Sequence, residues 1–528
     1  MMPAETQIAM RKAVSVNPAT GEVLSELVCA DEKTVHAAVA RARSAQPEWA
    51  KFGVRARIGI LREFQLILCD KKAEIAESIT REAGKPVAEA LTTEVLVVLD
   101  AARFLIDNAY RLLRDEAVPH GNLATKLKSG RLVREPYGVI GIISPWNYPF
   151  SIPATETLAA LLAGNTVVLK PSEFTSLVAL DLQSLLHQAG VPQDVFQVVA
   201  GDGATGAALV SGDGESAIDK LVFTGSVSTG KRIAALAAER LLPVVLELGG
   251  KDPMLVLEDA DLDVASSAAI WGAFVNAGQT CLSVERCYVH RNLYEKFLDA
   301  CVEKTEKLRV GHGLDDGTDV GPMIHERQLQ IVESHVQDAV ASGARVLAGG
   351  SRLLELGPNF YKPTVLADIT HAMRIMREET FGPVLPVMAF SNDDEAVRLA
   401  NDSEFGLAAS VFTRDHVRGE RLASRIRAGT VMVNDVVSCF GISEAPHGGA
   451  KSSGIGRAHG RFGLEEMVRL KYVDIDLVPG MKKVWWYGYG ARFTRSMKGF
   501  IDFQFARRLS DRLRGGLRSV GILRGKKL

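Results

Sequence analysis

The chain has 528 residues, of which 47% are hydrophobic, and a formal net charge of −1 at pH 7. This length and composition exclude a disordered chain and predict two or three folded domains. No apolar run reaches the ~20 residues needed to cross a bilayer, and the N-terminal segment lacks the pattern of a secretory signal. The six cysteines show neither a zinc-binding spacing nor a short disulfide framework. We therefore expect a cytoplasmic protein with reduced thiols and no metal site.

The first part of the chain changes from a helical to a strand pattern. Residues 31–114 carry apolar side chains at helical spacing, which predicts several amphipathic helices. Short runs rich in β-branched residues follow, separated by stretches long enough for helices. They predict strands at 139–143, 166–169, 195–199 and 220–223. This alternation predicts a parallel α/β sheet, an architecture that binds nucleotides at the carboxyl ends of its strands.

A second α/β pattern begins at residue 255 and contains a cysteine of interest. Cys281 ends the sequence Asn-Ala-Gly-Gln-Thr-Cys, and Glu247 lies upstream in Leu-Glu-Leu-Gly-Gly-Lys. A thiolate can form a covalent intermediate with an electrophilic carbon, and a carboxylate can activate the water that releases it. Taken singly, each residue would be an ordinary buried thiol or a solvated surface charge. The strands predicted in this part of the chain are 287–290, 344–347, 363–366, 384–388, 410–412 and 430–434.

The sequences around Glu247 and Cys281 resemble the paired signatures of the aldehyde dehydrogenase superfamily. In that family the cysteine is the nucleophile and the glutamate is the general base. Other stretches between about residues 17 and 471 resemble further motifs of the family. They are Pro-Trp-Asn-Tyr-Pro at 145–149, Leu-Lys-Pro-Ser-Glu at 169–173, Phe-Thr-Gly-Ser at 223–226 and Glu-Glu-Thr-Phe-Gly-Pro at 378–383.

The resemblance implies an α/β fold with a Rossmann-like NAD-binding domain, an α/β catalytic domain and a small β-structured oligomerisation arm. The NAD-binding domain would comprise residues 1–116 and 137–248, and the catalytic domain residues 249–450. The arm would comprise 117–136 and 463–478 and would pair subunits into a homodimer or homotetramer. Residues 481–528 form a C-terminal extension.

The resemblance also implies a mechanism. Cys281 attacks the aldehyde, while the Asn147 amide and the Cys281 backbone N–H stabilise the oxyanion. After hydride transfer to the nicotinamide, Glu247 activates the water that hydrolyses the thioester. Family members that pass the acyl group to coenzyme A usually lack this glutamate, so the expected product is a free acid. No histidine lies near Cys281 in the sequence, which argues against a phosphorylating dehydrogenase.

The expected cofactor is NAD, because Glu173 would accept hydrogen bonds from the adenosine ribose and repel a 2′-phosphate. Lys170 beside it leaves NADP open. The GxGxxG sequence at 201–206 is a weak signal, to which we assign a turn and helix packing near the adenosine. The cofactor-binding residues that the resemblance implies are Ser144, Pro145, Trp146, Lys170, Glu173, Gly203, Gly225, Ser226, Gly230, Leu248, Glu379 and Phe381.

The substrate is expected to be a hydrophobic aldehyde, aliphatic or aromatic. Residues 436–442, which the resemblance places at the substrate entrance, are mostly apolar, and no arginine occurs between Asn434 and Gly449. A succinate-semialdehyde type of activity stays an alternative, with Arg286 or another arginine supplied by folding. A catalytically inactive scaffold on the same fold is the second alternative, although such a scaffold has no need of Cys281, Glu247 and Asn147 together. His447 is interpreted as structural.

The C-terminal residues 481–528 differ from the rest of the chain in charge. They contain 13 Lys or Arg and two Asp, a local charge of +11, which leaves −12 for the remainder. Apolar residues at helical spacing between 493 and 513 predict a basic amphipathic helix. Two interpretations fit this extension: peripheral contact with an anionic membrane, or docking on an acidic face of a neighbouring subunit. Nucleic acid is a poorer third, and we expect no such partner because no known binding module accompanies the charge.

Overall fold

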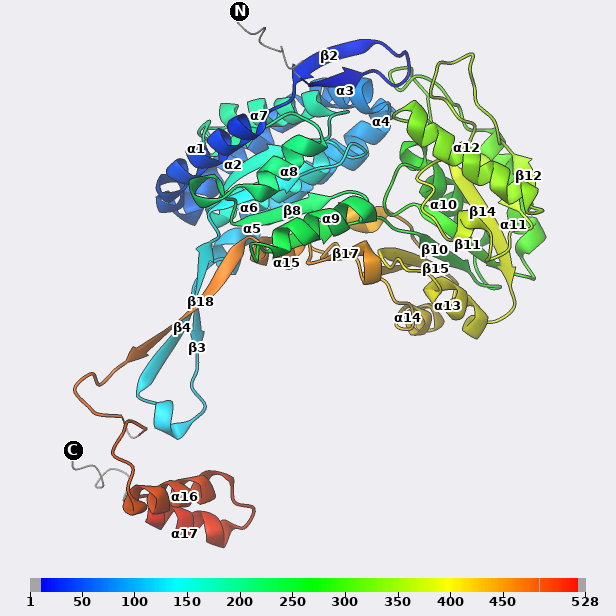
Figure 1. The fold of residues 1–528 in the computed structure, drawn as a ribbon. Helices are drawn as coiled ribbons and strands as arrows, with labels where there is room; N and C mark the ends of the chain where they lie inside the picture. The colour runs from blue at the N-terminus through cyan, green and yellow to red at the C-terminus, as the bar shows by residue number, and fades with distance from the viewer. Residues whose placement is uncertain (1–10, 484, 521–528) are drawn as a thin grey trace, which may run out of the picture. The chain divides into compact units, whose positions relative to one another are not determined.

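The computed structural model describes residues 11–483 and 485–520, which fall into two compact units. Within these residues, the first unit comprises 11–114 and 134–470, and the second comprises 115–133 and the residues from 471 onward. The first unit contains two α/β lobes, one drawn mainly in blue to green and the other in green to yellow (Figure 1). No helix of the described residues is both long and apolar enough to cross a membrane.

A six-stranded sheet forms the centre of the first lobe. Its strands lie in the order β17 (Gly454–Ile455), β9 (Val244–Glu247), β8 (Lys220–Thr224), β5 (Val139–Ile143), β6 (Thr166–Lys170) and β7 (Phe196–Val198). All neighbours are parallel except β17, which pairs antiparallel with β9. Every residue of β5 and β6 is buried, as expected of a parallel sheet with helices on both faces.

Alternate residues of the strands pack against different helices. Ile140 and Ile142 belong to a core shared with α2, α3, α5, α6 and α7, whereas Val139 and Ile143 pack with α1, α8 and α9. The helices of this lobe are α1 (Glu32–Lys51), α2 (Gly53–Asp70), α3 (Lys72–Ala83), α4 (Val87–Glu89), the π-helix η1 (Ala90–Val95), α5 (Leu96–Leu112), α6 (Ser151–Ala163), α7 (Ser176–Gln188), α8 (Gly203–Ser211), α9 (Val227–Ala238) and α15 (Gly460–Glu465). The antiparallel pair β1 (Lys12–Val16) and β2 (Val23–Val28) precedes them.

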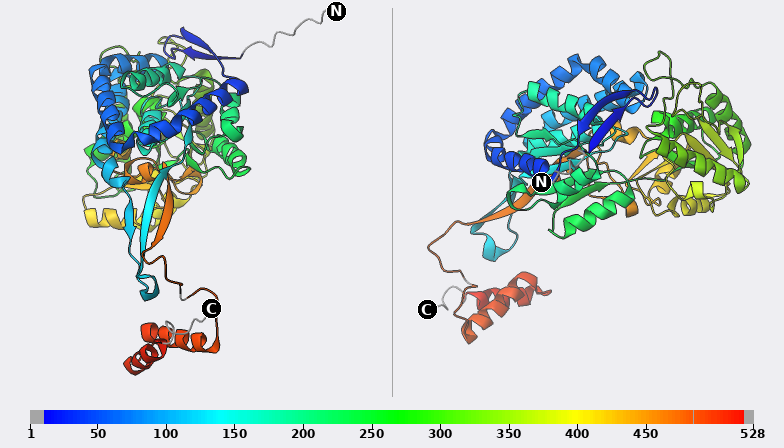
Figure 2. Two further views of the ribbon diagram at one scale, coloured as in Figure 1. Left: turned by 90° about the vertical axis from the view of Figure 1, so that its left-hand side faces the viewer. Right: turned by 45° about the horizontal axis from the view of Figure 1, so that its top comes forward.

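The second lobe is built on a seven-stranded sheet. Its strands lie in the order β12 (Arg345–Ala348), β13 (Thr364–Ala367), β14 (Val384–Phe390), β11 (Val284–His290), β10 (Asp252–Val256), β15 (Ala408–Phe412) and β16 (Thr430–Val433). Only the pair β12–β13 is antiparallel. The helices of this lobe are α10 (Leu262–Phe274), α11 (Tyr294–Glu306), α12 (Glu326–Ala341), α13 (Asp393–Asn401) and α14 (His416–Ala423). The two lobes lie side by side in the right-hand view of Figure 2.

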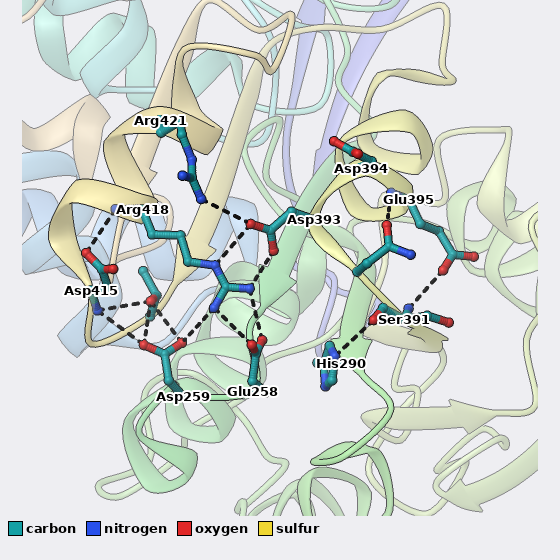
Figure 3. A network of polar contacts seen from close by, with 12 residues as sticks. Glu258, Asp259, His290, Ser391, Asp393, Asp394, Glu395, Asp415, Arg418 and Arg421 are labelled. Carbon is teal, nitrogen blue, oxygen red and sulfur yellow. Dashed lines mark hydrogen bonds and ion pairs between the residues drawn. The ribbon is translucent and has the colours of Figure 1, made fainter.

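An arginine-centred network holds two helices on the seven-stranded sheet (Figure 3). Arg418 of α14 donates to both oxygens of Glu258, just after β10, at 3.1 Å, and also to Asp393 at the start of α13. The Arg418 guanidinium holds the pKa of both carboxyl groups below the usual range. Bidentate pairs of this kind fix geometry as well as charge. The network therefore has a structural explanation, and its charges compensate one another.

The second unit contains the outer part of a three-stranded sheet and a helical hairpin. The strands lie in the order β18 (Val468–Asp476), β4 (Lys128–Pro136) and β3 (Glu116–Val118), and the helices are α16 (Ala491–Phe505) and α17 (Leu509–Ser519). Lys128 forms an ion pair with Asp474 across β4 and β18. β18 begins at Val468, and Leu464 and Met467, which precede it, are buried among the residues of α5 and α6. Pairing of subunits through these strands stays a prediction.

The predicted helices at 31–114 and every predicted strand are present, with strand ends within about three residues of the prediction. Three strands of the two large sheets were missed. β9 has four residues and ends in a glutamate, β10 begins with Asp-Pro, and β17 has two residues. Asp, Glu and Pro are uncommon in strands, so neither composition nor alternation marked these segments.

Candidate functional site

A cavity of about 300 Å³ lies at the carboxyl ends of β5, β8 and β9, where parallel sheets bind ligands. The seven-stranded lobe contributes Cys281, Glu379 and Phe381 to its wall. Both lobes therefore build the cavity. The residues from the six-stranded lobe are Pro145, Trp146, Asn147, Ile152, Thr155, Glu156, Thr224, Gly225, Ser226, Glu247, Leu248 and Gly249.

The loop before Cys281 has an unusual backbone conformation. Asn276, Ala277 and Gly278 follow α10 with φ values of 54°, 53° and 71°. A Cβ added at Gly278 would lie 2.1 Å from the Gly382 carbonyl oxygen, so only glycine fits there. The Asn276 N–H donates to Glu89 Oε2 at 2.9 Å, which holds the bend in place. Strained non-glycine residues of this kind cluster at functional sites.

Asn147 joins this loop to the segment that follows β5. Its Nδ2 donates to the Gln279 carbonyl oxygen at 3.0 Å, and its own carbonyl accepts from Asn276 Nδ2 at 2.9 Å. We call these two hydrogen bonds the Asn147 tether. The amide has a second N–H that no described hydrogen bond uses. The described hydrogen bonds leave the Cys281 backbone N–H without an acceptor. Two donors are therefore available near the thiol.

A buried ion pair holds the backbone of Asn147 in place. Lys85 Nζ lies 2.7 Å from Glu94 Oε1, and both side chains are fully buried. Lys85 also donates to the Asn147 carbonyl oxygen at 2.8 Å, and Glu94 Oε2 accepts from the N–H groups of Phe150 and Ser151. This pair was not predicted from the sequence. The feature that could have indicated it is a single glutamate within the otherwise uncharged run from Ala90 to Leu99.

The Glu247 carboxyl group is buried without a hydrogen-bond partner among the described residues. It is 5% exposed, and neither oxygen accepts a hydrogen bond from any described residue. Burial, and secondarily the negative charge of Glu156, raises the pKa of Glu247 well above its usual value. A Cβ at Gly448 would lie 3.0 Å from Glu247 Oε1, so the glycine lets the backbone approach the carboxyl group. A buried acid with no internal partner is typical of a site that meets a ligand or water.

Glu156, His447 and His459 line the same cavity as Glu247, and the sequence did not single out two of them. Glu156 of α6 accepts from Thr224 Oγ1 at 3.3 Å, and burial raises its pKa to about 8. Burial lowers the pKa of His447 to about 3 and that of His459 to about 4, so both rings are neutral at pH 7. His447 pairs through its backbone with Ala458, in line with the structural interpretation, and its Nε2 lies 3.9 Å from Glu247 Oε2.

The expected cofactor residues form two groups. Pro145, Trp146, Gly225, Ser226, Leu248, Glu379 and Phe381 line the cavity. Glu379 Oε1 accepts from the Gly250 N–H at 3.0 Å, and burial raises the Glu379 pKa to about 8. The remaining expected cofactor residues do not line this cavity. Lys170 Nζ is 3.5 Å from Glu173 Oε2 at the end of β6. Gly230 packs on Leu248, because an added Cβ would lie 2.5 Å from that side chain. Ser144 follows β5, and Gly203 begins α8.

A second cavity of about 260 Å³ lies on another side of Cys281. Apart from Cys281, Tyr148 is the one ionisable residue in its wall among the residues that the structure describes, and the Tyr148 hydroxyl lies 2.8 Å from Thr280 Oγ1. The loop expected at the substrate entrance supplies part of the wall. The lining residues are Thr92, Thr93, Val97, Tyr148, Ile152, Trp271, Thr280, Cys281, Leu282, Val437, Ser438, Phe440 and Gly441.

Comparison with known proteins decides the family. The model of the aldehyde dehydrogenase family matches residues 6–473. The chain belongs to the aldehyde dehydrogenase family. Its α/β fold class and its enzyme class, predicted from the motifs, are thereby confirmed. One similar solved structure is that of an NAD-dependent aldehyde dehydrogenase from Sinorhizobium meliloti, 37% identical with a TM-score of 0.86, covering 90% of this chain and 93% of that one.

Two curated relatives of this aldehyde dehydrogenase have different names. The chain is 41% identical over 497 residues to 4,4'-diapolycopene aldehyde oxidase from Methylomonas sp, and the match covers 94% of this chain and 91% of the relative. It is 38% identical to the mitochondrial succinate-semialdehyde dehydrogenase of Oryza sativa subsp. japonica, covering 87% and 85% of the two chains. These names differ in the aldehyde, so family membership alone leaves the substrate open.

The raised pKa of Cys281 predicts how its thiol reacts when no cofactor is bound. Burial, and secondarily the carboxyl groups of Asp252 and Glu379, raises that pKa, which disfavours the thiolate. We expect the rate of alkylation of Cys281 by iodoacetamide to rise about tenfold per pH unit from pH 7 to 9, without a plateau. Mass spectrometry of the Cys281 peptide measures it, in a Cys69→Ser background that removes the exposed thiol. A plateau below pH 8 would contradict the burial argument.

Proposed function

We propose that the protein oxidises an apolar aldehyde to the carboxylic acid with NAD, through a covalent intermediate on Cys281. One observation carries the proposal: Cys281 lines both cavities, the one between the lobes and the apolar one. A nucleophile in that position meets a cofactor on one side and the aldehyde on the other. Holding both reactants against one thiol is the geometry that covalent oxidation requires.

The residues of the larger cavity fit NAD. The N-terminus of α9 follows Ser226, and the free amides of its first turn suit a pyrophosphate. A Cβ at Gly249 would lie 2.6 Å from the Glu379 carboxyl group, so the glycine leaves that acid room to bind a ribose. When bound, NAD accepts the hydride that leaves the substrate carbon. Glu173, partly exposed beside Lys170, would hold the adenosine ribose and repel a 2′-phosphate.

The first covalent step falls to Cys281 and its two neighbouring donors. The thiolate forms a C–S bond with the aldehyde carbon, and the carbonyl oxygen takes the negative charge. The second N–H of Asn147 and the Cys281 backbone N–H would stabilise this oxyanion. After the hydride has left, the acyl group remains on Cys281 as a thioester.

The second step falls to Glu247. Its carboxylate takes a proton from water, the resulting hydroxide adds to the thioester carbonyl, and the C–S bond breaks to release the acid and the thiolate. A raised pKa makes Glu247 a stronger base than a solvated glutamate. Glu156 lines the same cavity with a raised pKa, and its negative charge contributes to the raised pKa of Glu247.

The apolar cavity supports a hydrophobic aldehyde over a semialdehyde with a carboxylate. Among the described residues no Lys or Arg lines it, so a buried substrate carboxylate would have no counter-ion. Arg286 cannot take that role, because its guanidinium is buried and donates to the carbonyl groups of Lys251, Leu399 and Ala400. The name of the 41% identical relative states a diapolycopene aldehyde, an apolar polyene, which supports the same class.

Replacement of Glu247 tests the mechanism. Glu247→Gln removes the base for hydrolysis and leaves the nucleophile, so we expect one rapid turnover of NADH per subunit and then a steady-state rate reduced at least about a hundredfold. Stopped-flow absorbance measures both phases. Cys281→Ala should abolish the burst as well, whereas Glu239→Gln, at an exposed position, should behave as wild type. Unchanged steady-state turnover in Glu247→Gln would show that another base acts.

The preference for NAD follows from Glu173. We expect a higher kcat/KM with NAD than with NADP, because the carboxylate repels the 2′-phosphate. Glu173→Gln should raise kcat/KM for NADP and so bring the ratio of kcat/KM with NAD to kcat/KM with NADP closer to one. The thermal stability of the variant should stay unchanged, because the position is partly exposed. A wild-type preference for NADP would overturn the assignment of Glu173.

A substrate series tests the apolar cavity. We expect kcat/KM for hexanal, decanal or benzaldehyde to exceed that for succinate semialdehyde at least about tenfold, since the cavity offers no counter-ion. Ser438→Arg places a cation in the wall and should shift the ratio toward the semialdehyde, whereas Ser438→Met, of similar length and uncharged, should not. A wild-type preference for succinate semialdehyde would contradict the substrate class.

A further inference from the structure

The two helices of the second unit meet along a seam of small residues. α16 and α17 lie side by side (Figure 2) and contact each other through Gly499 and Gly515, both buried. A Cβ at Gly515 would lie 2.5 Å from the Gly499 carbonyl oxygen, and a Cβ at Gly499 would lie 2.8 Å from the Gly515 carbonyl oxygen. The backbones therefore touch, and no large side chain fits between them. Close packing through small residues is the mode that helices use in an apolar surrounding.

Several large apolar side chains of this hairpin are exposed. Leu509, Leu513, Leu517 and Val520, at or just after α17, recur at three- or four-residue spacing and are 72%, 63%, 80% and 57% exposed. Ile501, Phe503 and Phe505 of α16 are exposed as well. A hairpin stable in water places such residues in its seam. Here the described residues leave them uncovered, and an exposed apolar surface of this kind marks an interaction site.

The same hairpin carries unpaired positive charge. Asp502 and Asp511 are its acidic residues, and neither forms an ion pair among the described residues. The basic side chains that are exposed and form no ion pair within the described part of the chain are Arg492, Arg495, Lys498, Arg507, Arg508, Arg512, Arg514 and Arg518. Positive charge beside an exposed aliphatic stripe is the pattern of helices that lie in a lipid headgroup layer.

Aromatic residues precede the hairpin, and its helices are short. Trp485, Trp486, Tyr487 and Tyr489 are all exposed, and Trp and Tyr are enriched at the boundary between lipid and water. α16 has 15 residues. Such a helix is about 22 Å long, less than the roughly 30 Å of a hydrocarbon core. The hairpin therefore fits a position in the membrane surface and not across it.

We propose that the α16–α17 hairpin is a docking surface for an anionic lipid bilayer. The bilayer supplies phosphates for the arginines and hydrocarbon for the leucines. An acidic face of another subunit would match the arginines but not the aliphatic stripe, and a second copy of the hairpin would repel the first by its like charge. This inference rests on the second unit alone and does not depend on the catalytic mechanism.

Sedimentation of the full-length protein with vesicles tests the proposal. We expect binding to vesicles of phosphatidylcholine with phosphatidylserine at low salt, weaker binding at high salt, and little binding to phosphatidylcholine alone. The triple variant Leu509→Ser, Leu513→Ser, Leu517→Ser and the quadruple variant Arg507→Gln, Arg508→Gln, Arg514→Gln, Arg518→Gln should each bind at least about tenfold more weakly.

Matched variants in the first unit provide controls. Leu241→Ser, Leu354→Ser, Val417→Ser changes three residues of similar exposure, and Lys33→Gln, Arg62→Gln, Arg291→Gln, Lys296→Gln removes the same charge from exposed positions. Both should bind vesicles as wild type does. All variants should keep the solution kcat/KM for hexanal, so loss of vesicle binding and failure of the catalytic proposal are distinguishable.

Three results would overturn the proposal. The first is absence of binding by the wild-type protein to anionic vesicles. The second is binding that the hairpin variants do not weaken. The third is a change of oligomeric state in those variants by analytical ultracentrifugation, which would assign the surface to another subunit.

Discussion

The Asn147 tether is the interaction on which the geometry of the site depends. Glu247 and the turn at Pro145 belong to the six-stranded lobe, while Cys281 belongs to the seven-stranded lobe. The two hydrogen bonds between Asn147 and the loop before Cys281 fix these parts against each other at about 3 Å. The buried pair of Lys85 and Glu94 then fixes Asn147. Because both partners of that pair are buried, removing one would leave an uncompensated charge behind the tether.

The buried acids of the site differ in whether their charge is paired. Glu94 is fully paired and hydrogen bonded, which makes it a structural support. Glu247 is buried with no hydrogen-bond partner among the described residues, and burial raises the pKa values of Glu156 and Glu379 in the same cavity to about 8. A bound cation would favour the ionised form of such acids in a low-dielectric cavity, and the oxidised nicotinamide ring has that charge. A cation in the cavity would also favour the thiolate of Cys281.

The sequence predicted the reacting groups better than their supports. Cys281, Glu247 and Asn147 lie in short motifs whose glycines and resemblance to a family marked them, and the structure brings all three to one cavity. Lys85, Glu94 and Glu156 had no such mark, because their roles arise from contacts between segments far apart in the chain. The basic extension was predicted as one amphipathic helix, but it forms two, and the break comes at Ala506–Arg508. Sequence periodicity indicates which residues share one face of a helix. It does not show the seam of glycines, which depends on how the second helix packs against the first.

The central claim is that Cys281 carries the acyl group that Glu247 releases. Intact-peptide mass spectrometry of Glu247→Gln, quenched in acid after reaction with decanal and NAD, tests it most directly. The account predicts that the peptide containing Cys281 gains the mass of the decanoyl group and that hydroxylamine removes it. An unmodified Cys281 peptide after NADH has formed, or the acyl group on another residue, would contradict the account.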